Sequence, residues 1–301
     1  ALALQGVATA YLNSLSGDAF GRQLADGLVR AGVVLAHPHP VRQPTSLAVV
    51  DVDADGQPRY SFYRDGVADR AGSAADLVAA TRSMPGLRAV CTGCLALAPQ
   101  EGERYLAWLR DCRARGLLGI VDANLRPSAV DDLPAYRAQV FQALALADVV
   151  KASDEDLAVL LPGEPPLAAA RALLDMTQAQ VVALTLGAQG AVALVRNGAA
   201  WHACEEDEVD VVDTVGAGDC FLAGFAAGLL PGQPIGGEDL AAAVPMALAR
   251  GVASASHCIA RRGCAAPTAV ELTGRPPVPV RRLAPDMLAA AAQNFAPFRA
   301  R

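Results

Sequence analysis

The sequence predicts an α/β fold built on a doubly wound sheet with helices on both faces, together with a small antiparallel β unit. From residue 74 to residue 196, short continuous apolar segments alternate with segments of helical periodicity, as in a parallel sheet buried on both faces. Between residues 35 and 70 this alternation stops, and two β-rich segments flank a glycine-containing turn. We therefore expect an α/β core made of residues 1–34 and 71–301, and a separate β unit at 35–70.

Composition and charge restrict the class of protein. The 301 residues are 53% hydrophobic and 19% charged, which supplies a large core and excludes a mainly disordered chain. The net charge of -6 argues against a nucleic-acid partner. The longest apolar stretches are too short to span a bilayer, and no charged-then-apolar leader is present. We expect a soluble cytoplasmic protein without a membrane segment.

The first part of the chain combines helical and β patterns. Gly6 is expected to end a short helical segment, since glycine adopts the left-handed conformation that closes helices. In order, we then expect a strand at 7–15, an amphipathic helix at 19–31, and hairpin strands at 45–52 and 59–63. The turn between the hairpin strands contains Asp53, Asp55 and Gly56, residues that favour tight turns.

The remainder of the chain follows the periodicity of a layered α/β core. We expect helices at 74–83, 102–115, 136–147, 153–161 and 166–176, and strands at 89–91, 119–122, 149–150, 181–186 and 191–196. Ser153 is in position to cap its helix. Ala-rich helices at 220–230 and 240–256 follow, and the Pro/Gly-rich segment 274–279 predicts a surface loop.

The cysteines do not form a disulfide framework. There are seven, an odd number scattered through a long chain, which is typical of reduced thiols in a reducing compartment. Cys91 and Cys94 have the spacing of a redox or half-zinc motif, but no second pair follows at zinc-finger spacing. We interpret them as small residues at the end of a strand.

The strongest chemical signal is a glycine turn at the start of a helix. A β-branched run meets Gly216, Ala217 and Gly218 and continues directly into an apolar helical pattern. Such a turn lets the backbone approach a ligand, and the helix start offers N–H groups and the positive end of its dipole to an anion. Asp219 places a carboxylate beside that anion, where it can accept a proton from an alcohol.

Two other phosphate-binding motifs fail at this turn. A dinucleotide fingerprint requires a third glycine where Phe221 stands, and a Walker A loop requires a lysine, whereas the only lysine is the distant Lys151. A plain turn with Asp219 as a capping residue remains open. A second polar cluster, Asp122, Asn124 and Arg126, closes a predicted strand, which is a ligand position in open α/β sheets or, alternatively, a solvated loop.

The segment from Asp213 to Phe221, with Gly224 after it, resembles the C-terminal signature of the PfkB-type carbohydrate kinases, the ribokinase family. The similarity runs through nearly the whole chain and implies a ribokinase-like fold in which the 35–70 unit is a β lid. It also implies ATP and Mg²⁺ as cofactors. By this resemblance Asp219 is the catalytic base, and the amides of Gly216, Ala217 and Gly218 form the hole for the γ-phosphate.

Further segments resemble the family in the same order. Ser16 to Gly21 is similar to its Gly-Asp-x-x-Gly turn. Nucleotide-binding roles are implied for Thr185, Gly187 and Gly190, and for Lys151, Ser153 and Asp156. The last three stand where many members carry Asn-x-x-Glu, which organises Mg²⁺ and phosphate, so that Asp156 would act on Mg²⁺ indirectly. Ser153 also has a plain capping explanation.

Substrate-binding roles follow from the resemblance to two subfamilies. Fructokinases and 2-keto-3-deoxygluconate kinases carry the pattern of Asp122, Asn124 and Arg126, and their lid strand is similar to the segment with Tyr63 and Arg64. Asp65 and Asp69 beside Arg64 weaken a dedicated carboxylate clamp. The chain therefore resembles bacterial fructokinases most, which implies phosphorylation of D-fructose at its 6-hydroxyl. A 2-keto-3-deoxygluconate kinase and a non-catalytic sugar- or nucleotide-binding relative remain alternatives.

Two departures from the family pattern lie near the ends. The family's first strand, with its sugar-binding Asp, and a Gly-Gly-x-x-x-Asn turn would precede Ala1; we expect them in the natural protein. The segment from Ile259 to Cys264 resembles only loosely the loop that forms a monovalent-cation site. That resemblance implies K⁺ near the backbone of Asp213. The lid often forms a dimer contact in this family, which implies a homodimer.

Overall fold

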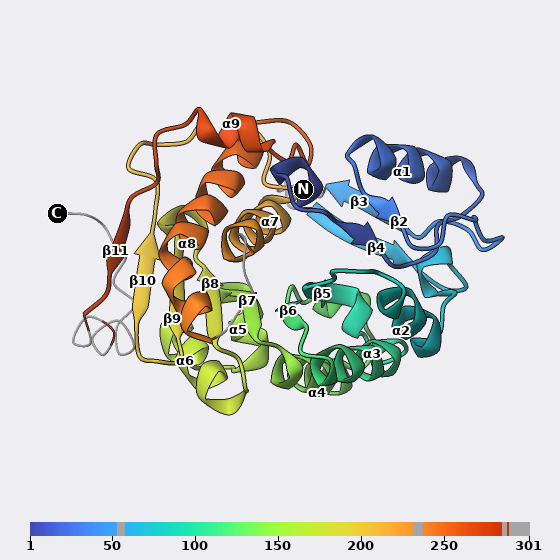
Figure 1. Ribbon diagram of the computed structural model, residues 1–301, viewed down its shortest axis with the longest axis horizontal. Helices are drawn as coiled ribbons and strands as arrows, with labels where there is room; N and C mark the ends of the chain where they lie inside the picture. The colour runs from blue at the N-terminus through green and yellow to red at the C-terminus, as the bar shows by residue number, and fades with distance from the viewer. Residues whose placement is uncertain (53–57, 231–236, 285–287, 289–301) are drawn as a thin grey trace.

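A seven-stranded mixed sheet forms the centre of the computed structural model, which describes residues 1–52, 58–230, 237–284 and 288 (Figure 1). Its strands stand side by side in the order β11-β10-β9-β8-β7-β6-β5. Their bounds are β5 Ala89–Gly93, β6 Leu118–Asp122, β7 Val149–Ser153, β8 Val181–Thr185, β9 Ala191–Val195, β10 Ala200–Ala203 and β11 Val280–Arg282. The first four strands are parallel, and the last three join antiparallel.

The parallel half agrees with the sequence prediction, whereas the antiparallel half does not. Thr185 of β8 pairs with Ala191 of β9, so the connection is a hairpin too short for the crossover that parallel strands need. The prediction took β9 for a parallel strand because its sequence is a continuous apolar run, and the structure does bury both of its faces. β10 and β11 were not predicted at all, since they are short and lack a run of β-branched residues.

Helices cover both faces of the sheet (Figure 1). One face carries α3 Gly102–Ala114, α4 Leu133–Leu146, α5 Asp154–Leu160 and α6 Pro166–Met176. The other carries α7 Ala217–Leu229 and α8 Gly237–Ile259. Each face has its own apolar core; Trp108 and Tyr136 are fully buried in the first, and Phe225 in the second. These bounds confirm the predicted helices to within a few residues.

The N-terminal part is less regular than predicted. It contains a 3₁₀ turn at Ala3–Gln5 that Gly6 closes, β1 Ala10–Tyr11, α1 Ala19–Arg30 and β2 Val34–Leu35. The strand predicted at 7–15 is reduced to two residues, and it pairs with β2 instead of joining the central sheet. Pro38 and Pro40 follow β2, and proline cannot donate to a strand ladder, so the pairing stays short.

The predicted β unit is an antiparallel hairpin. β3 Leu47–Val52 pairs with β4 Pro58–Tyr63 as a separate two-stranded sheet, and the predicted turn at 53–56 lies outside the described residues. Asp18 connects this unit to α1, because its carboxylate accepts hydrogen bonds from the backbone of Gly21 and from both the backbone and the hydroxyl of Thr45. These bonds hold the pKa of Asp18 well below its usual range.

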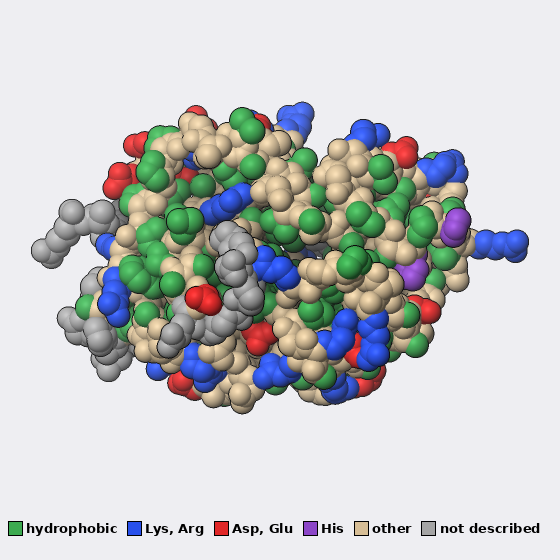
Figure 2. Space-filling view, in the orientation of Figure 1, with side chains coloured by type: hydrophobic (Ala, Val, Ile, Leu, Met, Phe, Trp, Pro, Cys, Tyr) green, Lys and Arg blue, Asp and Glu red, His purple; other side chains and the backbone are tan. Residues whose placement is uncertain are grey.

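The remaining elements are 3₁₀ turns at Ala68–Arg70, Cys94–Leu97, Pro127–Ala129 and Gly187–Gln189, and the helices α2 Ala74–Arg82 and α9 Ala269–Thr273. Segment 274–279 is irregular, as predicted. Within the described ranges, no helix combines the length and apolarity needed to cross a membrane. On the face shown in Figure 2, basic, acidic and hydrophobic side chains are interspersed.

Glycines let α7 and α8 pack closely. A Cβ on Gly228 would lie 2.5 Å from the Cα of Ala247, and one on Gly224 would lie 2.5 Å from the carbonyl oxygen of Arg250. Both neighbours are backbone atoms, which cannot move without displacing α8. The close packing matters for function, because α7 begins at the predicted anion-binding turn.

Replacing Gly228 with Ala is expected to destabilise the protein by about 1–3 kcal/mol, the usual cost of overpacking a core. Gly27→Ala is the matched control, since a Cβ on Gly27 meets no atom within 4 Å. Alanine in that exposed helix should instead stabilise by about 0.5–1 kcal/mol. Urea unfolding of both variants measures the two changes, and a loss no larger for Gly228→Ala than for Gly27→Ala would contradict the packing argument.

Candidate active site

Most of the predicted site residues gather where three parallel strands end. A cavity of about 1360 Å³ lies at the carboxyl ends of β6, β7 and β8 and the start of α7, the position of ligands in open α/β sheets. The predicted residues that line it are Asn124, Arg126, Lys151, Ser153, Asp156, Thr185, Gly187, Gly190, Ala217 and Gly218. Predicted residues from four separate segments therefore line one cleft.

The glycine turn has the conformation that its sequence predicts. Gly216 has φ +81° and precedes the first residue of α7, a left-handed conformation that favours glycine. The first turn of an α-helix leaves N–H groups without intrahelical partners, and these attract anions. The N–H of Ala217 donates to the carbonyl oxygen of Thr214, and the N–H of Cys220 donates to that of Gly216. The N–H groups of Gly218 and Asp219 are therefore the ones in this turn left to face a ligand.

A buried ammonium group stands against this turn. The Nζ of Lys151 lies 3.0 Å from an Asp122 oxygen, and both side chains are almost fully buried. A Cβ on Gly218 would lie 3.2 Å from the same Nζ, so the ammonium lies close against the backbone of the turn and would have to shift to admit a side chain there. Burial raises the pKa of Asp122, and the Lys151 charge opposes that shift. The Lys151 ammonium thus lies beside the predicted phosphate position, with Asp122 as its partner.

Asp219 follows Gly218 in the first turn of α7 and is solvent-exposed. Its negative charge helps to raise the pKa of Asp122 and of the Cys91 thiol, so the three groups are neighbours although 128 positions separate the first and last in sequence. Asp219 also lines a second, smaller pocket of about 230 Å³, whose other walls include Thr9 and Tyr11. The carboxylate is thus placed between the large cleft and the N-terminal segment.

Cys91 and Cys94 lie at a strand end, as predicted. Cys91 is in β5, and desolvation raises its pKa to about 12, which keeps the thiol protonated at neutral pH. A methyl group on the intervening Gly93 would overlap the carbonyl oxygen of Asp122, so the small residue is required by the close approach of β5 to β6. Nothing in this geometry calls for a redox role.

The loops after β6 and β7 are tied together by Asp156. Its carboxylate accepts hydrogen bonds from the backbone N–H groups of Leu125 and Ser153, at 2.7 and 2.8 Å. The Ser153 hydroxyl accepts in turn from the N–H of Asp156, which completes a capping box. Ser153 therefore caps its helix as predicted, and Asp156 positions the loop that carries Asn124. The backbone of Asn124 has φ +37°, an uncommon value for a residue other than glycine.

Three comparisons with known proteins agree with this geometry. The profile of the pfkB family carbohydrate kinases matches residues 1–270. This chain belongs to the PfkB carbohydrate kinases. It is therefore an ATP-dependent sugar phosphotransferase, and the predicted family and fold class are confirmed.

Several relatives and solved structures that resemble this kinase are fructokinases. A fructokinase of Rhizobium leguminosarum bv. trifolii is 34% identical over 76% of this chain and 68% of its own length. A fructokinase of Klebsiella pneumoniae is 30% identical over 80% and 76%, respectively. A fructokinase of Vibrio cholerae O395, solved with fructose, ADP and a calcium ion, superposes with a TM-score of 0.76 at 25% identity, over 91% of this chain and 87% of that one.

The fold alone does not decide the substrate. Aminoimidazole riboside kinase from Salmonella enterica superposes with a TM-score of 0.75 at 24% identity, over 91% of the kinase described here and 87% of that chain. A furanoside and a free sugar thus share one scaffold, and function must be argued from the side chains of the site.

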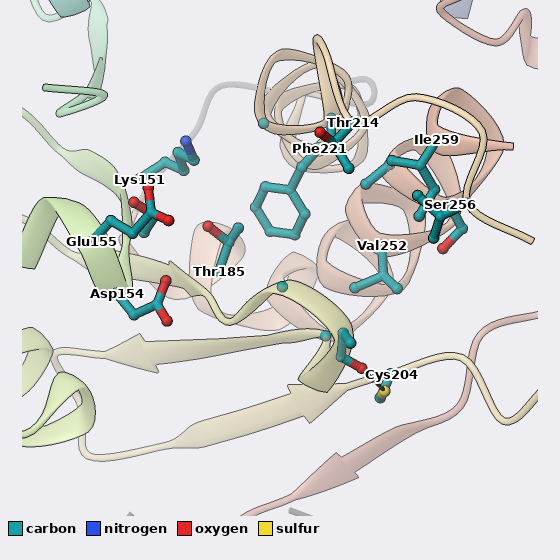
Figure 3. A pocket seen from close by; sticks show the side chains of 18 of the residues that line it. Lys151, Asp154, Glu155, Thr185, Cys204, Thr214, Phe221, Val252, Ser256 and Ile259 are labelled. Atoms are coloured by element: carbon teal, nitrogen blue, oxygen red, sulfur yellow. Dashed lines mark hydrogen bonds between the residues drawn. The ribbon is translucent and has the colours of Figure 1, made fainter. Parts of the chain in front are cut away.

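The kinase has an apolar slot that the sequence prediction missed. Figure 3 shows Phe221, Val252 and Ile259 on one side of the cavity, Lys151 on the other, and Thr185 between them. A cavity that is apolar at one end and lined by an ammonium and backbone amides at the other suits a flat base joined to phosphates. Its residues lie on helices whose periodicity is indistinguishable from that of ordinary core residues, so the sequence held no signal for them.

The turn predicted to bind the nucleotide is closely packed. Gly187 and Gly190 have φ +54° and +77°, and a methyl group on Gly190 would overlap the carbonyl oxygen of Ala203. Glycine is required at both positions by conformation or contact. Thr185 precedes this turn and points into the cavity beside Phe221 (Figure 3).

Tyr63 and Arg64 lie apart from the large cleft of the kinase. Tyr63 is 63% exposed on β4. Arg64 lies 3.3 Å from Asp69 and 3.8 Å from Glu101, and donates to the carbonyl oxygen of Leu95. Glu101 also pairs with Arg70 and Arg104. Arg64 is therefore matched by carboxylates.

A polar network between the N-terminal segment and α3 was also missed. The Tyr105 hydroxyl donates to the Asn13 side chain at 2.9 Å, and Arg104 donates to the Tyr105 oxygen. Burial raises the pKa of Tyr11, next to this network, to about 12. Tyr11 lines the smaller pocket together with Asp219, so the network stands next to that pocket.

Asp213 organises the loop before the glycine turn. Its carboxylate accepts hydrogen bonds from the N–H groups of Val215 and Gly263, at 2.9 and 2.8 Å. These bonds hold the pKa of Asp213 below its usual range. The loop at 259–264 is thereby fastened to the residues that lead into the glycine turn of the kinase.

Proposed function

We propose that this kinase is a fructokinase that converts D-fructose and ATP to fructose 6-phosphate and ADP. One observation carries the mechanism: the backbone amides of Gly218 and Asp219, the Lys151 ammonium and the Asp219 carboxylate meet at the start of α7. The similarity to the fructokinases of Rhizobium and Klebsiella, and to the Vibrio enzyme solved with bound fructose, supports fructose as the sugar.

The three groups divide the chemistry of phosphoryl transfer. Asp219 accepts the proton of the sugar's 6-hydroxyl as the hydroxyl oxygen bonds to the γ-phosphorus. The bond from that phosphorus to the β,γ-bridging oxygen breaks, and ADP leaves. Lys151 and the amides of the first turn of α7 stabilise the negative charge that spreads over the transferred group.

The acidic groups around the cleft fit Mg²⁺ and nucleotide. Asp154 and Glu155 line the cavity near Lys151 (Figure 3), and carboxylate oxygens are ligands that Mg²⁺ prefers, mostly through water. When bound, Mg²⁺ neutralises phosphate charge. Asp156 acts indirectly by fixing the loop that carries Asn124. The backbone near Asp213, fastened to Gly263, is proposed to hold a monovalent cation such as K⁺.

A neutral sugar suits the charges near the hairpin better than an acid. Arg64 and Arg70 are each engaged by carboxylates, so neither is left as a dedicated partner for a substrate carboxylate. A hydroxyl-rich sugar carries no charge and needs no dedicated cation. This balance favours fructose over 2-keto-3-deoxygluconate, and we assign Asp122, Asn124 and Arg126 to the sugar or phosphate side of the cleft.

The same reasoning extends to assembly and location. We propose that residues 35–70 act as a lid over the sugar and as the contact between two copies of a homodimer. We further propose that the enzyme works in the cytoplasm as a soluble protein. A solution mass equal to one chain over a wide concentration range would contradict the homodimer.

The substrate assignment predicts a ranking of sugars. With one preparation of the full-length enzyme, kcat/KM is expected to be highest for fructose, lower for ribose and lowest for 2-keto-3-deoxygluconate. A coupled assay that detects ADP measures all three. A preference for the acid would overturn fructose while leaving the kinase mechanism intact, and no turnover with any sugar would favour a non-catalytic binding protein.

A further inference from the structure

Three cysteine side chains converge behind the glycine turn. Cys220 lies in α7 directly after Asp219, Cys258 lies in the last turn of α8, and Cys264 lies in the loop that follows. Their sulfur atoms all lie within 4.8 Å of one another. Cys220 and Cys258 are fully buried and Cys264 is exposed, and none of the three forms a disulfide.

The surrounding backbone holds this three-cysteine cluster in place. The Cys258 thiol donates to the carbonyl oxygen of Val215, and the Ile259 carbonyl oxygen accepts from the N–H groups of Val212 and Asp213. Helices α7 and α8, which carry two of the thiols, pack closely through their glycines. The cluster is thus preorganised by contacts that do not depend on a ligand, which reduces the entropic cost of binding one.

We propose that Cys220, Cys258 and Cys264 form a binding site for a thiophilic d¹⁰ cation, Zn²⁺ or Cu⁺. Soft thiolate ligands select these ions. Three sulfurs at the usual Zn–S distance of about 2.3 Å stand about 4 Å apart, which the cluster reaches with small side-chain rotations. Each thiol releases its proton to solvent as its sulfur binds, and exposed Cys264 gives the ion a route of entry. For Zn²⁺, water completes the fourth position.

The proposed site lies against the anion-binding turn. A methyl group on Gly216 would overlap the sulfur of Cys264, so this sulfur touches the backbone of the turn. Three thiolates with Zn²⁺ or Cu⁺ leave a net negative charge next to the amides assigned to the γ-phosphate. Because like charges repel, the bound ion should weaken nucleotide binding. This consequence rests on the proposed phosphate site, whereas the metal site itself does not.

Metal titration of the reduced full-length protein, without oxygen, tests the site. Zn²⁺ and Cu⁺ are titrated separately against chromophoric chelators of known affinity. We expect one ion per chain bound by the wild type, and at least about 100-fold weaker binding by Cys264→Ser, since even outer-shell changes cost 10–100-fold. Cys220→Ser should weaken binding similarly. Cys112→Ser, a single thiol removed from the opposite face of the sheet, should bind as the wild type does.

Two results would overturn the metal site. One is equal metal affinity of the wild type and Cys264→Ser, and the other is loss of binding in Cys112→Ser as well. Thermal melting of each variant separates loss of a ligand from loss of the fold, and exposed Cys264 is the position least able to disturb the core. If the wild type binds only one of the two ions tightly, that ion is the ligand of the site.

Coupling to the turn is measured through a non-hydrolysable ATP analogue, because ADP lacks the γ-phosphate on which the repulsion acts. Protein loaded with one equivalent of ion and freed of excess should bind the analogue more weakly than the metal-free protein. Cys264→Ser treated in the same way should show no difference, which controls for chelation of the ion by the nucleotide. Equal affinity of loaded and metal-free wild type for the analogue would overturn the coupling, whereas the stoichiometry decides the metal site independently of the kinase assignment.

Discussion

Asp219→Asn is expected to lower kcat by about 10²–10⁴-fold, the usual contribution of a general base. Asparagine has nearly the same size and keeps the start of α7, but its amide cannot accept the hydroxyl proton. The affinity for ADP and the melting temperature should change little, because Asp219 is exposed and stands at the sugar side of the turn. Steady-state kinetics at saturating fructose, with ADP titration and thermal melting, measure the three quantities.

Asp26→Asn provides the matched control for this substitution. Asp26 is an exposed carboxylate on α1 that lines neither the large cleft nor the smaller pocket, so the same chemical change removes a charge outside the site. Its kinetics should equal those of the wild type. A rate for Asp219→Asn close to the control would remove the general base from the mechanism, whatever the sugar.

Lys151→Met should lower both activity and stability. Loss of the ammonium removes charge stabilisation at the transferred phosphoryl group, and removing one such group from an anion hole costs about 10²–10³-fold in kcat. The carboxylate of Asp122 also loses its partner while it stays buried. Breaking a buried ion pair on one side destabilises by about 3–5 kcal/mol. Steady-state kinetics and urea unfolding measure the two effects.

The stability of Lys151→Met should depend on pH in a definite direction. Burial already raises the pKa of Asp122 above its ordinary value of 3.8, and without Lys151 nothing of comparable size opposes that shift. The native state then binds more protons than the unfolded state above pH 3.8, so the free energy of unfolding falls as pH rises from there through the raised pKa. The variant should therefore lose more stability at about pH 8 than at about pH 5.

A double variant separates the two roles of Lys151. Adding Asp122→Asn to Lys151→Met removes the unpaired charge, so much of the stability and most of the pH dependence should return. The turnover should stay low, because the ammonium is still missing. Recovery of activity together with stability would show that Lys151 acts only through the fold.

Most secondary structure was predictable because it depends on local patterns. The core helices and the parallel strands β5 to β8 follow from apolar periodicity and from caps such as Ser153, and the structure reproduces them within a few residues. The strands that were predicted wrongly or not at all depend on pairing with other strands. β10 is short and is a strand because it pairs with β9 and β11, and β1 has only two residues because its partner β2 has only two.

The candidate site divides in the same way. The sequence alone determined the anion-binding turn, because Gly216, Gly218 and Asp219 are contiguous and their chemistry depends on local backbone conformation. Only the tertiary structure decided that Lys151 faces Gly218, that Arg64 is held by Asp69 and Glu101, and that three cysteines converge behind the turn. Those contacts join residues from different strands and helices. The distances between them are set by the strand order of the sheet and by the packing of its two helical layers, which no local pattern in the sequence encodes.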